Sequence, residues 1–526
     1  MKDGWRRTIS SAIALLFRRL SFTVLLILRT AFVTLPIFLF WYIYDYAYGY
    51  WMLQFPPESG LFGPAWPPSR TRLVILMAVI PAWGASMAVG MVLWSLFKYL
   101  FARGMRRRPG GEDYEAAIPR ENTRESTLRV HRLCSRSLGC SYLVFGCFSI
   151  CVAMAISGVY MYKTYELPGD HRYRPDVVAA LEAPRPTGYY NGTKVFIAVL
   201  FNNNIDILPH WIEEFTKVIH YLGTANVFIS VVESNSWDGT AEMLDEWKGT
   251  LDGMGVAHLI HTRDHVVPRP SDRDRIDFLS AARNLALAPL VEKGGYDVVL
   301  FSNDILIKAE SVVELLKTNN GEWDMVCGLD VGRWGLYDVW VVRDRLGRLV
   351  SSLWPYFLED AGIQAVMEDE PAPVFTCWNG IVAFRADPVL PIHLRKPGRL
   401  STSPLPRPLS NTHPAYPQPA SLTPALTPPL AFRPSTAKEC ISSESFNFPY
   451  DLRRQFDMQR IFLNPRVINA YEWRYFVWYK YITRHWVVVW WMKNVEVGNG
   501  MQFAKMVIGD AKRVWTWDGG ECHPWI

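Results

Sequence analysis

Short apolar runs alternate with segments of helical spacing along the chain after residue 190. The runs predict strands, and the apolar residues between them recur at helical spacing, which predicts helices. The predicted strands cover residues 195–201, 226–233, 257–261 and 297–301, and the predicted helices cover residues 209–221, 239–248 and 278–292. This alternation is typical of an α/β domain with a mostly parallel sheet, and such sheets bind ligands at the carboxyl ends of their strands.

Longer apolar stretches occupy the first third of the chain. They cover residues 22–44, 73–96 and 138–160, and each is close to the roughly 20 residues that a helix needs to cross a bilayer. Buried core helices are the alternative, but the stretches show little polar face. We therefore predict a membrane region at 1–162 with three transmembrane helices, followed by a stalk at 163–190. Two helices instead of three is the other interpretation.

The loops between these stretches set the orientation. Arginines precede the first stretch and crowd the loop between the second and third, and Lys and Arg favour the cytosolic side of a membrane. An odd number of spans then places the rest of the chain in the lumen of the secretory pathway, and we expect the Golgi membrane as its location. Asn191 begins an Asn-Gly-Thr glycosylation acceptor that only a lumenal chain can use. One or two disulfides can form among the lumenal cysteines, in pairs that the sequence does not assign: Cys327, Cys377, Cys440 and Cys522.

Residues 396–437 break the strand–helix pattern. They are rich in Pro, Ser, Thr and Leu, hold almost no acidic residues, and predict a disordered insertion or translated intron sequence. The lumenal domain is therefore predicted at 191–395 and 438–526. Its tail after Tyr471 is dense in Trp, and the apolar run at 487–491 is too short to span a membrane. We expect this tail to pack on the domain or, as the alternative, to rest on the membrane surface.

Composition agrees with a membrane protein and argues against a nucleic-acid partner. The 526 residues are 50% hydrophobic and 14% aromatic, which is rich for a purely soluble protein. The formal net charge of +5 is small for this length. A multi-span transporter is disfavoured, because most of the chain is not membrane-like.

Polar residues follow the first two predicted strands. Asn202 ends the first, and Glu233-Ser234 begins a turn that runs to Thr240 after the second. Carboxylate and amide groups at strand ends can bind a ribose or a base, although a capped strand-to-helix connection explains the same residues. Asn202, Glu233 and Ser234 are therefore candidate nucleotide contacts.

The fourth predicted strand ends in Ser302-Asn303-Asp304. Divalent cations such as Mg²⁺ and Mn²⁺ take oxygen ligands and bridge diphosphates, so one or two acids at this edge suffice when phosphates complete the shell. Asp304 is the candidate metal ligand, with Asn303 beside it. An Asp that caps the following helix is the alternative.

Further candidates lie on either side of this strand. Arg283, on the preceding helix, could approach a phosphate or a carboxylate, although a surface ion pair is the commoner use of an arginine. Asp338 lies in a charged and aromatic stretch, and Trp378-Asn379 follows later in the chain. Polar groups beside an indole suit a carbohydrate, whose apolar face packs on aromatic rings, but a core position for Trp378 is equally compatible.

Together these segments resemble the fungal capsule-associated α-1,3-mannosyltransferase family, also called the cryptococcal mannosyltransferase family. The resemblance covers about 194–393 and 438–470. The segments that carry it are 196–202, Glu233-Ser234-Asn235-Ser236, Ala282-Arg283-Asn284, Phe301-Ser302-Asn303-Asp304, Tyr337-Asp338-Val339-Trp340, Cys377-Trp378-Asn379-Gly380, Glu439-Cys440 and Ser443-Glu444-Ser445.

The resemblance implies a GT-A-like nucleotide-sugar fold, GDP-mannose as donor, Mn²⁺ or Mg²⁺ as cofactor, and an α-linked product formed with retention. It implies catalytic roles for Asp304, Arg283 and Asp338, with Asp304 as metal ligand and Arg283 stabilising phosphate charge. It places the glycan acceptor near Asp338, Trp378, Asn379 and Glu444. Glycosyltransferases commonly carry Asp-x-Asp at the metal site, and Ser302 replaces the first acid here. This departure keeps an alternative open: a non-catalytic carbohydrate-binding or scaffolding subunit of a polysaccharide-synthesis complex.

Overall fold

The computed structural model describes residues 167–263, 275–396, 429–436, 439, 441–484 and 486–508. The chain divides into two compact units, Met1–Thr164 and Tyr165–Ile526, and every described residue belongs to the second. The predicted transmembrane helices at 22–44, 73–96 and 138–160 lie outside the described residues. Among the helices that are described, none is both long enough and apolar enough to cross a bilayer.

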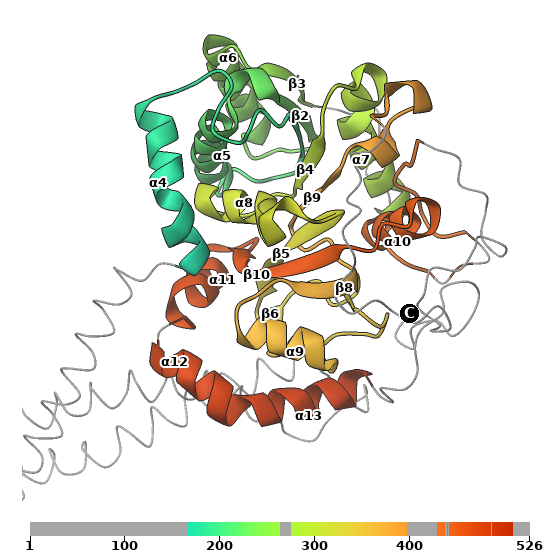
Figure 1. Cartoon of the computed structure of the whole chain (residues 1–526). Helices are drawn as coiled ribbons and strands as arrows, with labels where there is room; N and C mark the ends of the chain where they lie inside the picture. Colours follow the sequence, from blue (N-terminus) through green and yellow to red (C-terminus); the bar gives the residue numbers. More distant parts are fainter. Residues whose placement is uncertain are drawn as a thin grey trace, which may run out of the picture. The chain divides into compact units, whose positions relative to one another are not determined.

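The strands of the described chain form one ten-stranded mixed sheet (Figure 1). They are β1 (Val195–Phe201), β2 (Val227–Glu233), β3 (Ala257–His261), β4 (Val298–Ser302), β5 (Met325–Gly332), β6 (Gly335–Leu336), β7 (Arg343–Asp344), β8 (Ala372–Thr376), β9 (Ile381–Arg385) and β10 (Ile461–Asn469). The order is β3-β2-β1-β4-β9-β5-β10-β8-β7, with β6 paired to β5. The first four strands in this order are parallel, whereas β9 runs antiparallel to both β4 and β5. The parallel half follows the prediction closely, and the other half is mixed rather than parallel.

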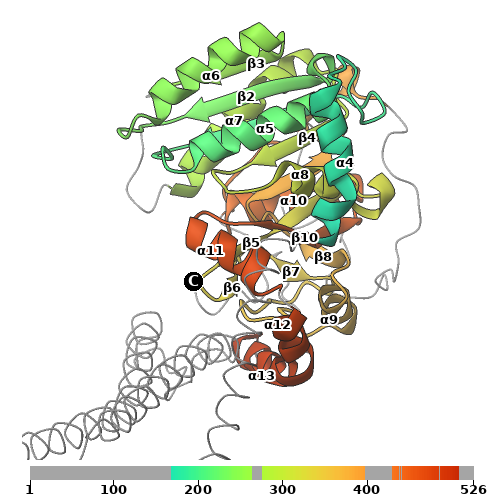
Figure 2. The same cartoon turned by 90° about the vertical axis from the view of Figure 1, so that its left-hand side faces the viewer.

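Helices cover both faces of the sheet (Figures 1 and 2). They are α4 (Pro168–Glu182), α5 (Leu208–Leu222), α6 (Thr240–Met254), α7 (Arg275–Lys293), α8 (Ala309–Leu316), α9 (Asp360–Met367), α10 (Glu444–Phe456), α11 (Trp473–Val477), α12 (Trp486–Trp491) and α13 (Val497–Ile508). Two π-helical turns, η7 (Trp478–Ile482) and η8 (Met492–Glu496), continue α11 and α12. In both views α12 and α13 lie at the opposite end of the domain from α6 and β3.

Six of the described strands contribute to two hydrophobic cores, because successive side chains of a strand point to opposite faces: β1, β2, β4, β5, β9 and β10. On β1, Phe196 and Ala198 belong to the core that also contains residues of α7 and α10. The residues between and beside them, Val195, Ile197 and Val199, belong to the core under α5 and α8. This double burial explains why the central strands read as continuous apolar runs.

The stalk predicted for 163–190 is wrong over most of its length. Residues 168–182 form α4, which packs on α5 and α8 and buries Tyr173, Val177 and Ala180 in the core. Asp170 is also buried, where it accepts a hydrogen bond from the Ser311 hydroxyl at 2.9 Å. The folded domain therefore begins at about residue 167 rather than at 191.

The insertion predicted for 396–437 ends earlier than expected. Residues 429–436 are part of the fold, with the side chains of Leu430 and Phe432 buried in the core. The Asn284 side chain pairs with the Phe432 backbone, accepting from its N–H at 2.8 Å and donating to its carbonyl at 2.9 Å. Residues 397–428 lie outside the described residues, so their predicted disorder stays a prediction.

The tryptophan-rich tail packs on the domain, as expected, over its described residues up to 508. Val488 and Ala504 are buried. Gly500 lies so close to the Trp354 backbone that an added Cβ would stand 1.9 Å from the Trp354 carbonyl oxygen. The side chains of Met492 and Met501 pack against the main core. The tail is therefore held by one side of its helices.

Candidate active site

Two loops at the carboxyl edge of the parallel strands are joined by hydrogen bonds. After β1, the Asn202 amide donates to the Ser234 carbonyl at 2.7 Å. Asn203 accepts from the Trp237 N–H at 3.0 Å, and the Asn204 N–H donates to the Thr240 hydroxyl at 2.8 Å. The segments after β1 and β2 therefore form one rim, which contains the predicted nucleotide contacts Asn202 and Ser234.

Glu233, at the end of β2, holds the backbone of this rim through hydrogen bonds. Its side chain is buried, and its two carboxylate oxygens accept from the backbone N–H groups of Ser236 at 2.8 Å and Arg263 at 2.6 Å. Both oxygens thus hold loop backbone, which is the structural use that the sequence left open. A nucleotide contact by Glu233 stays a prediction.

Asp238 closes the second loop. It accepts from the N–H of Ile205 at 3.0 Å and from both the N–H and the hydroxyl of Thr240, at 3.1 and 2.6 Å. Burial acts to raise the pKa of Asp238, but these hydrogen bonds outweigh it and lower that pKa below its usual value. The carboxylate of Asp238 therefore holds the rim together by accepting hydrogen bonds from both loops.

Asp304 stands at the end of β4 and is partly exposed. The Asn204 amide donates to its Oδ2 at 2.7 Å. Desolvation raises the pKa of Asp304 to about 6, although the Asn204 hydrogen bond opposes this shift. Since Asn202 donates to Ser234 and its N–H donates to Asn204 at 2.6 Å, a chain of hydrogen bonds links the end of β2 to Asp304.

Arg283 joins several predicted residues from distant segments. From α7 it forms a buried ion pair with Glu444, at 3.0 Å between Nε and Oε1, and donates to the Asn303 side chain at 3.3 Å. Its guanidinium lies 4.6 Å from the Trp378 ring centroid and 5.6 Å from that of Phe432. The structure therefore brings Arg283, Asn303, Trp378 and Glu444 together beside Asp304.

Trp378 is a core residue. It is 1% exposed, its ring makes edge-to-face contacts with Phe301, Phe432 and Phe448, and the Arg283 guanidinium lies over the ring. The ring therefore offers no surface on which an acceptor sugar could stack, which corrects that prediction. Glu444 is buried by its pairing with Arg283, so it has no direct route to an acceptor either.

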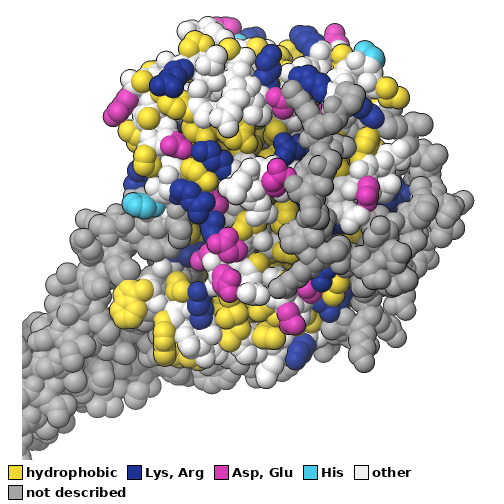
Figure 3. Space-filling view, viewed as in Figure 1, with side chains coloured by type: hydrophobic (Ala, Val, Ile, Leu, Met, Phe, Trp, Pro, Cys, Tyr) yellow, Lys and Arg dark blue, Asp and Glu magenta, His cyan; other side chains and the backbone are white. Residues whose placement is uncertain are grey.

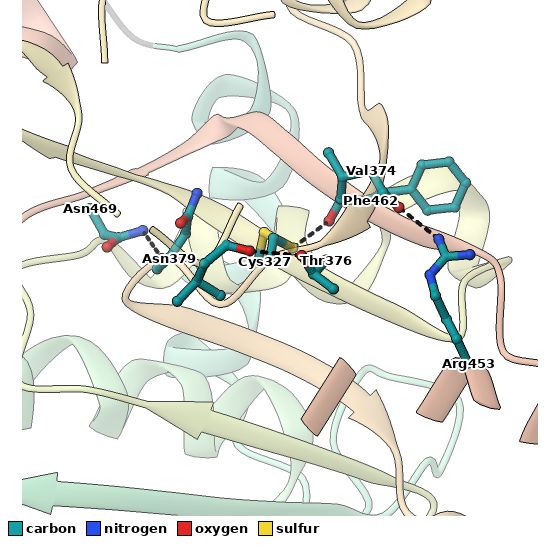
Figure 4. The surroundings of a disulfide bond; sticks show 9 residues. Cys327, Val374, Thr376, Asn379, Arg453, Phe462 and Asn469 are labelled. Carbon is teal, nitrogen blue, oxygen red and sulfur yellow. Dashed lines mark hydrogen bonds between the residues drawn. A yellow bond between two sulfur atoms is a disulfide. The ribbon is translucent and has the colours of Figure 1, made fainter. Parts of the chain in front are cut away.

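The turn after β8 holds the backbone of the loop that follows β4 and contains Asn303 and Asp304. Gly380 has a φ of +75°, and an added Cβ would stand 2.0 Å from the Asn469 side chain, so only glycine fits. The Gly380 carbonyl accepts from the Asn303 N–H at 2.8 Å. A disulfide between Cys377 and Cys327 ties the same turn to β5 (Figure 4).

Two buried amides lie beside this disulfide. Figure 4 shows Asn379 and Asn469 on one side of it and Arg453 on the other. The Asn469 amide donates to the Asn379 carbonyl at 3.2 Å. Asn379 is fully buried, and within the described chain neither polar atom of its side chain has a hydrogen-bond partner.

Asp330 belongs to the charged and aromatic stretch noted in the sequence, but no role was predicted for it. It lies near the end of β5 opposite Asn469 of β10, is fully buried, and neither of its carboxylate oxygens has a hydrogen-bond partner among the described residues. Burial raises its pKa well above the usual value, and repulsion from Asp338 and Asp304 raises it further. The sequence held a signal, because Asp330 comes near the end of the mainly apolar β5 and Asp304 comes soon after the mainly apolar β4.

Asp338 completes an acidic cluster with Asp304 and Asp330. It is partly exposed, and its Oδ1 accepts from the Val341 N–H at 3.2 Å. Desolvation raises the pKa of Asp338 to about 6. Three carboxyl groups whose charged forms are all disfavoured by burial are suited to bind a cation or to share protons.

The acidic cluster does not form a complete metal site. In the described ranges, no three His, Cys, Asp or Glu side chains gather closely enough to hold a metal ion by themselves. One or two carboxylates with a ligand's phosphates remain sufficient for a hard cation. The unpaired oxygens of Asp330 are the observation that fits such an ion.

Aromatic side chains border the cluster. Tyr471 accepts from the Asn303 amide at 2.8 Å, and its ring centroid lies 5.5 Å from that of Tyr337. Tyr337 is 60% exposed. Burial of the Tyr471 hydroxyl and the negative charges of Asp330 and Asp304 raise the pKa of Tyr471 well above its usual value, so this hydroxyl stays protonated.

Ser302 occupies the place of the first acid in Asp-x-Asp and is used structurally. It is fully buried, accepts from the Trp211 indole N–H at 3.1 Å and donates to the Asn303 carbonyl at 2.7 Å. This residue therefore has no role as a metal ligand.

Comparisons with solved structures give distant similarities only. A mannosyltransferase from Pyrobaculum calidifontis in complex with GDP-Man and Mn²⁺ is 14% identical with a TM-score of 0.28, over 60% of this chain and 67% of that one. S. aureus TarS 1-349 is 12% identical with a TM-score of 0.28, over 53% and 60%. Glucosyl-3-phosphoglycerate synthase from Mycobacterium tuberculosis, with Mn²⁺, UDP and its product, is 12% identical with a TM-score of 0.26, over 56% and 75%. At these scores none of the three carries an argument.

Comparison with the curated proteins gives no match. The family model described as cryptococcal mannosyltransferase 1, in contrast, matches residues 194–451. This region holds β1 to β9, the start of α10 and all the acids of the cluster. Through this region the chain belongs to the cryptococcal mannosyltransferase family.

Proposed function

We propose that the chain is a metal-dependent mannosyltransferase, which transfers mannose from GDP-mannose to a glycan acceptor and forms an α-1,3 linkage with retention. The observation that carries this proposal is the acidic cluster at the carboxyl edge of the sheet, in which Asp330 is buried with both oxygens unpaired. Family membership supports the choice of mannose.

The acids divide into two kinds by their exposure. Asp304 is partly exposed at the rim and would hold Mn²⁺ or Mg²⁺ together with the donor's phosphates, whereas Asp330 is fully buried and, because its pKa is raised, would add negative charge only when a bound cation favours loss of its proton. When bound, the cation would neutralise charge on the departing diphosphate. Apart from this step, the described residues bind and position the reactants.

Arg283 acts as a positioning residue in this proposal. Its charge is already paired with Glu444, and it donates to the Asn303 side chain next to Asp304. The rim formed by Asn202 and Ser234 would face the nucleoside, and its hydrogen-bond chain through Asn204 connects that face to Asp304. Retention needs no general base, so Asp338 is assigned to binding rather than to proton abstraction.

Tyr337 replaces Trp378 as the aromatic group for the acceptor. Its ring is exposed, and its backbone N–H donates to the Asp330 carbonyl at 3.0 Å, which holds the ring next to the acidic cluster. Sugars pack their apolar face on such rings. Asn379 remains a candidate for a polar contact, because its amide is unpaired among the described residues.

A screen of sugar nucleotides with and without Mn²⁺ tests the proposal. The wild-type chain should transfer from GDP-mannose only with the metal present. Asp304→Ala should abolish transfer, because the anchor of the metal and diphosphate is lost. It should change the thermal unfolding midpoint little, because Asp304 is partly exposed, although the fold loses the acceptor of the Asn204 hydrogen bond. Glu246→Ala, an exposed acid on α6, is the matched control. Undiminished turnover with normal metal dependence in Asp304→Ala would sink the assignment.

A second function follows from Ser302. Because this position is committed to Trp211 and to the loop backbone, the chain lacks half of the usual acidic pair. A non-catalytic carbohydrate-binding or scaffolding subunit of a polysaccharide-synthesis complex would have this feature. Calorimetric binding of GDP-mannose or of an oligosaccharide, without turnover for any donor, would favour this function.

We also propose that the domain is lumenal and membrane-anchored, in the Golgi. The disulfide between Cys327 and Cys377 supports an oxidising compartment. Asn191 is exposed in the turn before β1, at the opposite end of that strand from the candidate site, so a glycan there would not obstruct the site. Protease digestion of residues after 190 in sealed, cytosol-side-out vesicles would contradict this location.

A further inference from the structure

One side of the C-terminal helices leaves large apolar side chains exposed. We define the tail face as the exposed side chains of α12, η8 and α13: Trp486, Trp490, Lys493, Val495, Lys505 and Met506. Trp486 is 60% exposed and Trp490 is 56% exposed. In Figure 3, hydrophobic side chains gather over α12 at the lower left of the face shown.

The tail face has a fixed direction, because the other side of these helices is anchored. Val488 and Ala504 are buried, Glu496 is also buried, and Gly500 lies directly against the Trp354 backbone. The exposed tryptophans therefore cannot turn inward without displacing this packing. Their side chains therefore stay exposed on the surface of the domain.

The chemistry of the tail face fits a lipid surface. Indole rings prefer the headgroup level of a bilayer, and lysines reach anionic headgroups while their stems lie along apolar surface. Lys493 and Lys505 are exposed, and the single acid between residues 486 and 508, Glu496, is buried on the opposite side. The exposed charge of this helical segment is therefore only positive, as in helices that lie in a membrane interface.

The start of the domain lies next to the same C-terminal segment. Asp170, at the beginning of α4, forms an ion pair with Lys480 of η7 at 2.5 Å, and Leu167 shares a core with Phe476 and Tyr479. Only residues 481–485 separate Lys480 from Trp486 in the chain. The point at which the folded domain begins is thus held beside the segment that leads into the tail face.

The length of chain before this point limits its distance from a membrane. The third predicted span ends at residue 160, and only residues 161–166 separate it from Leu167. So few residues reach at most about 20 Å even when fully extended. If the span crosses the bilayer, Leu167 and the C-terminal segment beside it are close to the lumenal headgroups.

We propose that the tail face lies in the headgroup layer of the membrane that anchors the chain, with anionic lipid as its partner. This inference rests on the proposed membrane anchoring. The domain then has two attachments, the short connection at Leu167 and the tail face, and these hold one end of the sheet toward the bilayer.

Lipid photo-crosslinking of the full chain tests this proposal. The chain is reconstituted in nanodiscs of phosphatidylcholine and phosphatidylserine, with a phosphatidylcholine that carries a diazirine near the headgroup, and adducts are mapped by mass spectrometry. We expect adducts in residues 138–160 and in residues 486–495. Trp486→Ser with Trp490→Ser should lower the adducts at 486–495 severalfold, leave those at 138–160 unchanged, and retain the unfolding midpoint.

Trp237 provides the matched control. It is 84% exposed and lies on the loop just before α6, and Figure 1 shows α6 at the other end of the domain from α12. Adducts at 138–160 with no more at 486–495 than around Trp237 would overturn the inference and leave the anchoring intact. Absence of adducts from 138–160 as well would overturn the anchoring and the inference with it.

Discussion

Removal of residues 397–428 should leave the domain folded, whereas removal of residues 397–437 should destabilise it severely. The two deletions differ only in residues 429–437. The described part of this difference buries Leu430 and Phe432 and carries Arg433, whose guanidinium pairs with Asp451 at 2.7 Å and with Glu439 at 2.6 Å.

The shorter deletion is geometrically simple, because both of its ends are held at the same place. The Lys396 N–H donates to the Asp387 side chain at 3.1 Å, and the Leu430 N–H donates to the Pro388 carbonyl at 2.9 Å. A linker of about six Gly and Ser residues, which can reach about 20 Å, therefore replaces the segment. Shortening a loop from about 30 residues to about six lowers its closure cost by about 1.5 kcal/mol.

The longer deletion removes side chains that the core needs. Loss of a buried Phe costs about 3–5 kcal/mol and loss of a buried Leu about 2–5 kcal/mol. Asp451 and Glu439 would also lose Arg433. Arg454 still pairs with Asp451 at 2.6 Å and with Glu439 at 3.9 Å, so this loss costs less than the ~3–5 kcal/mol of an uncompensated buried charge. These values do not add exactly, but together they approach the whole stability of a domain, about 5–15 kcal/mol.

Denaturant unfolding followed by tryptophan fluorescence compares both deletions with the full chain. Phe432→Ala in the full chain serves as a point test of the same packing, with Phe432→Leu as the milder companion. Equal unfolding midpoints for the longer deletion and the full chain would refute the packing of 429–436. Loss of folding in the shorter deletion would show that residues 397–428 are a structural element.

Three further substitutions test separate features. Cys327→Ser with Cys377→Ser should lower the free energy of unfolding by about 4 kcal/mol, as loop entropy predicts for a separation of 50 residues; identical denaturation midpoints for oxidised and reduced wild type would contradict this. Burial lowers the pKa of His210, so the unfolded chain binds the proton at a higher pH than the folded chain does, and the stability should fall as the pH drops below about 6.5. His210→Gln should flatten this fall when unfolding midpoints are measured between about pH 7.5 and 5.5. An unchanged slope in the variant would argue against a role of His210 in the pH dependence. Arg283→Met should cost about 3–5 kcal/mol by leaving Glu444 charged and buried, and adding Glu444→Leu should restore much of the loss; no recovery in denaturant unfolding would disprove the pairing.

The parallel half of the sheet could be predicted from local pattern. Strands β1 to β4 are apolar runs bounded by turns, so local periodicity was sufficient to identify them, and the β1–β2 and β2–β3 pairs are each joined through one α-helix. The same pattern does not reveal that β9 enters between β4 and β5 or that β10 returns beside β5. Those pairings join segments far apart in the chain, and only the packing of the whole sheet selects them.

The candidate site was predicted in part. The motifs with Arg283, Asn303, Trp378 and Glu444 do converge, but composition cannot tell a ring that packs in the core from one that faces a ligand. Asp330 was not assigned a role, because an acid at a strand end is common and its unpaired burial exists only in the folded state. Likewise, Pro-rich surroundings hide the two apolar anchors at 430 and 432.

The disulfide turns one part of the site into a closed ring of covalent bonds. Cys327 and Cys377 enclose the segment that contains Asp330, Tyr337 and Asp338. A protease that cuts the backbone once inside this segment would leave the two pieces joined, so the chain would keep its mass until a reductant separates them. The acids and the exposed tyrosine would stay attached on both sides of such a cut, and the nicked protein would resemble the intact protein on a non-reducing gel.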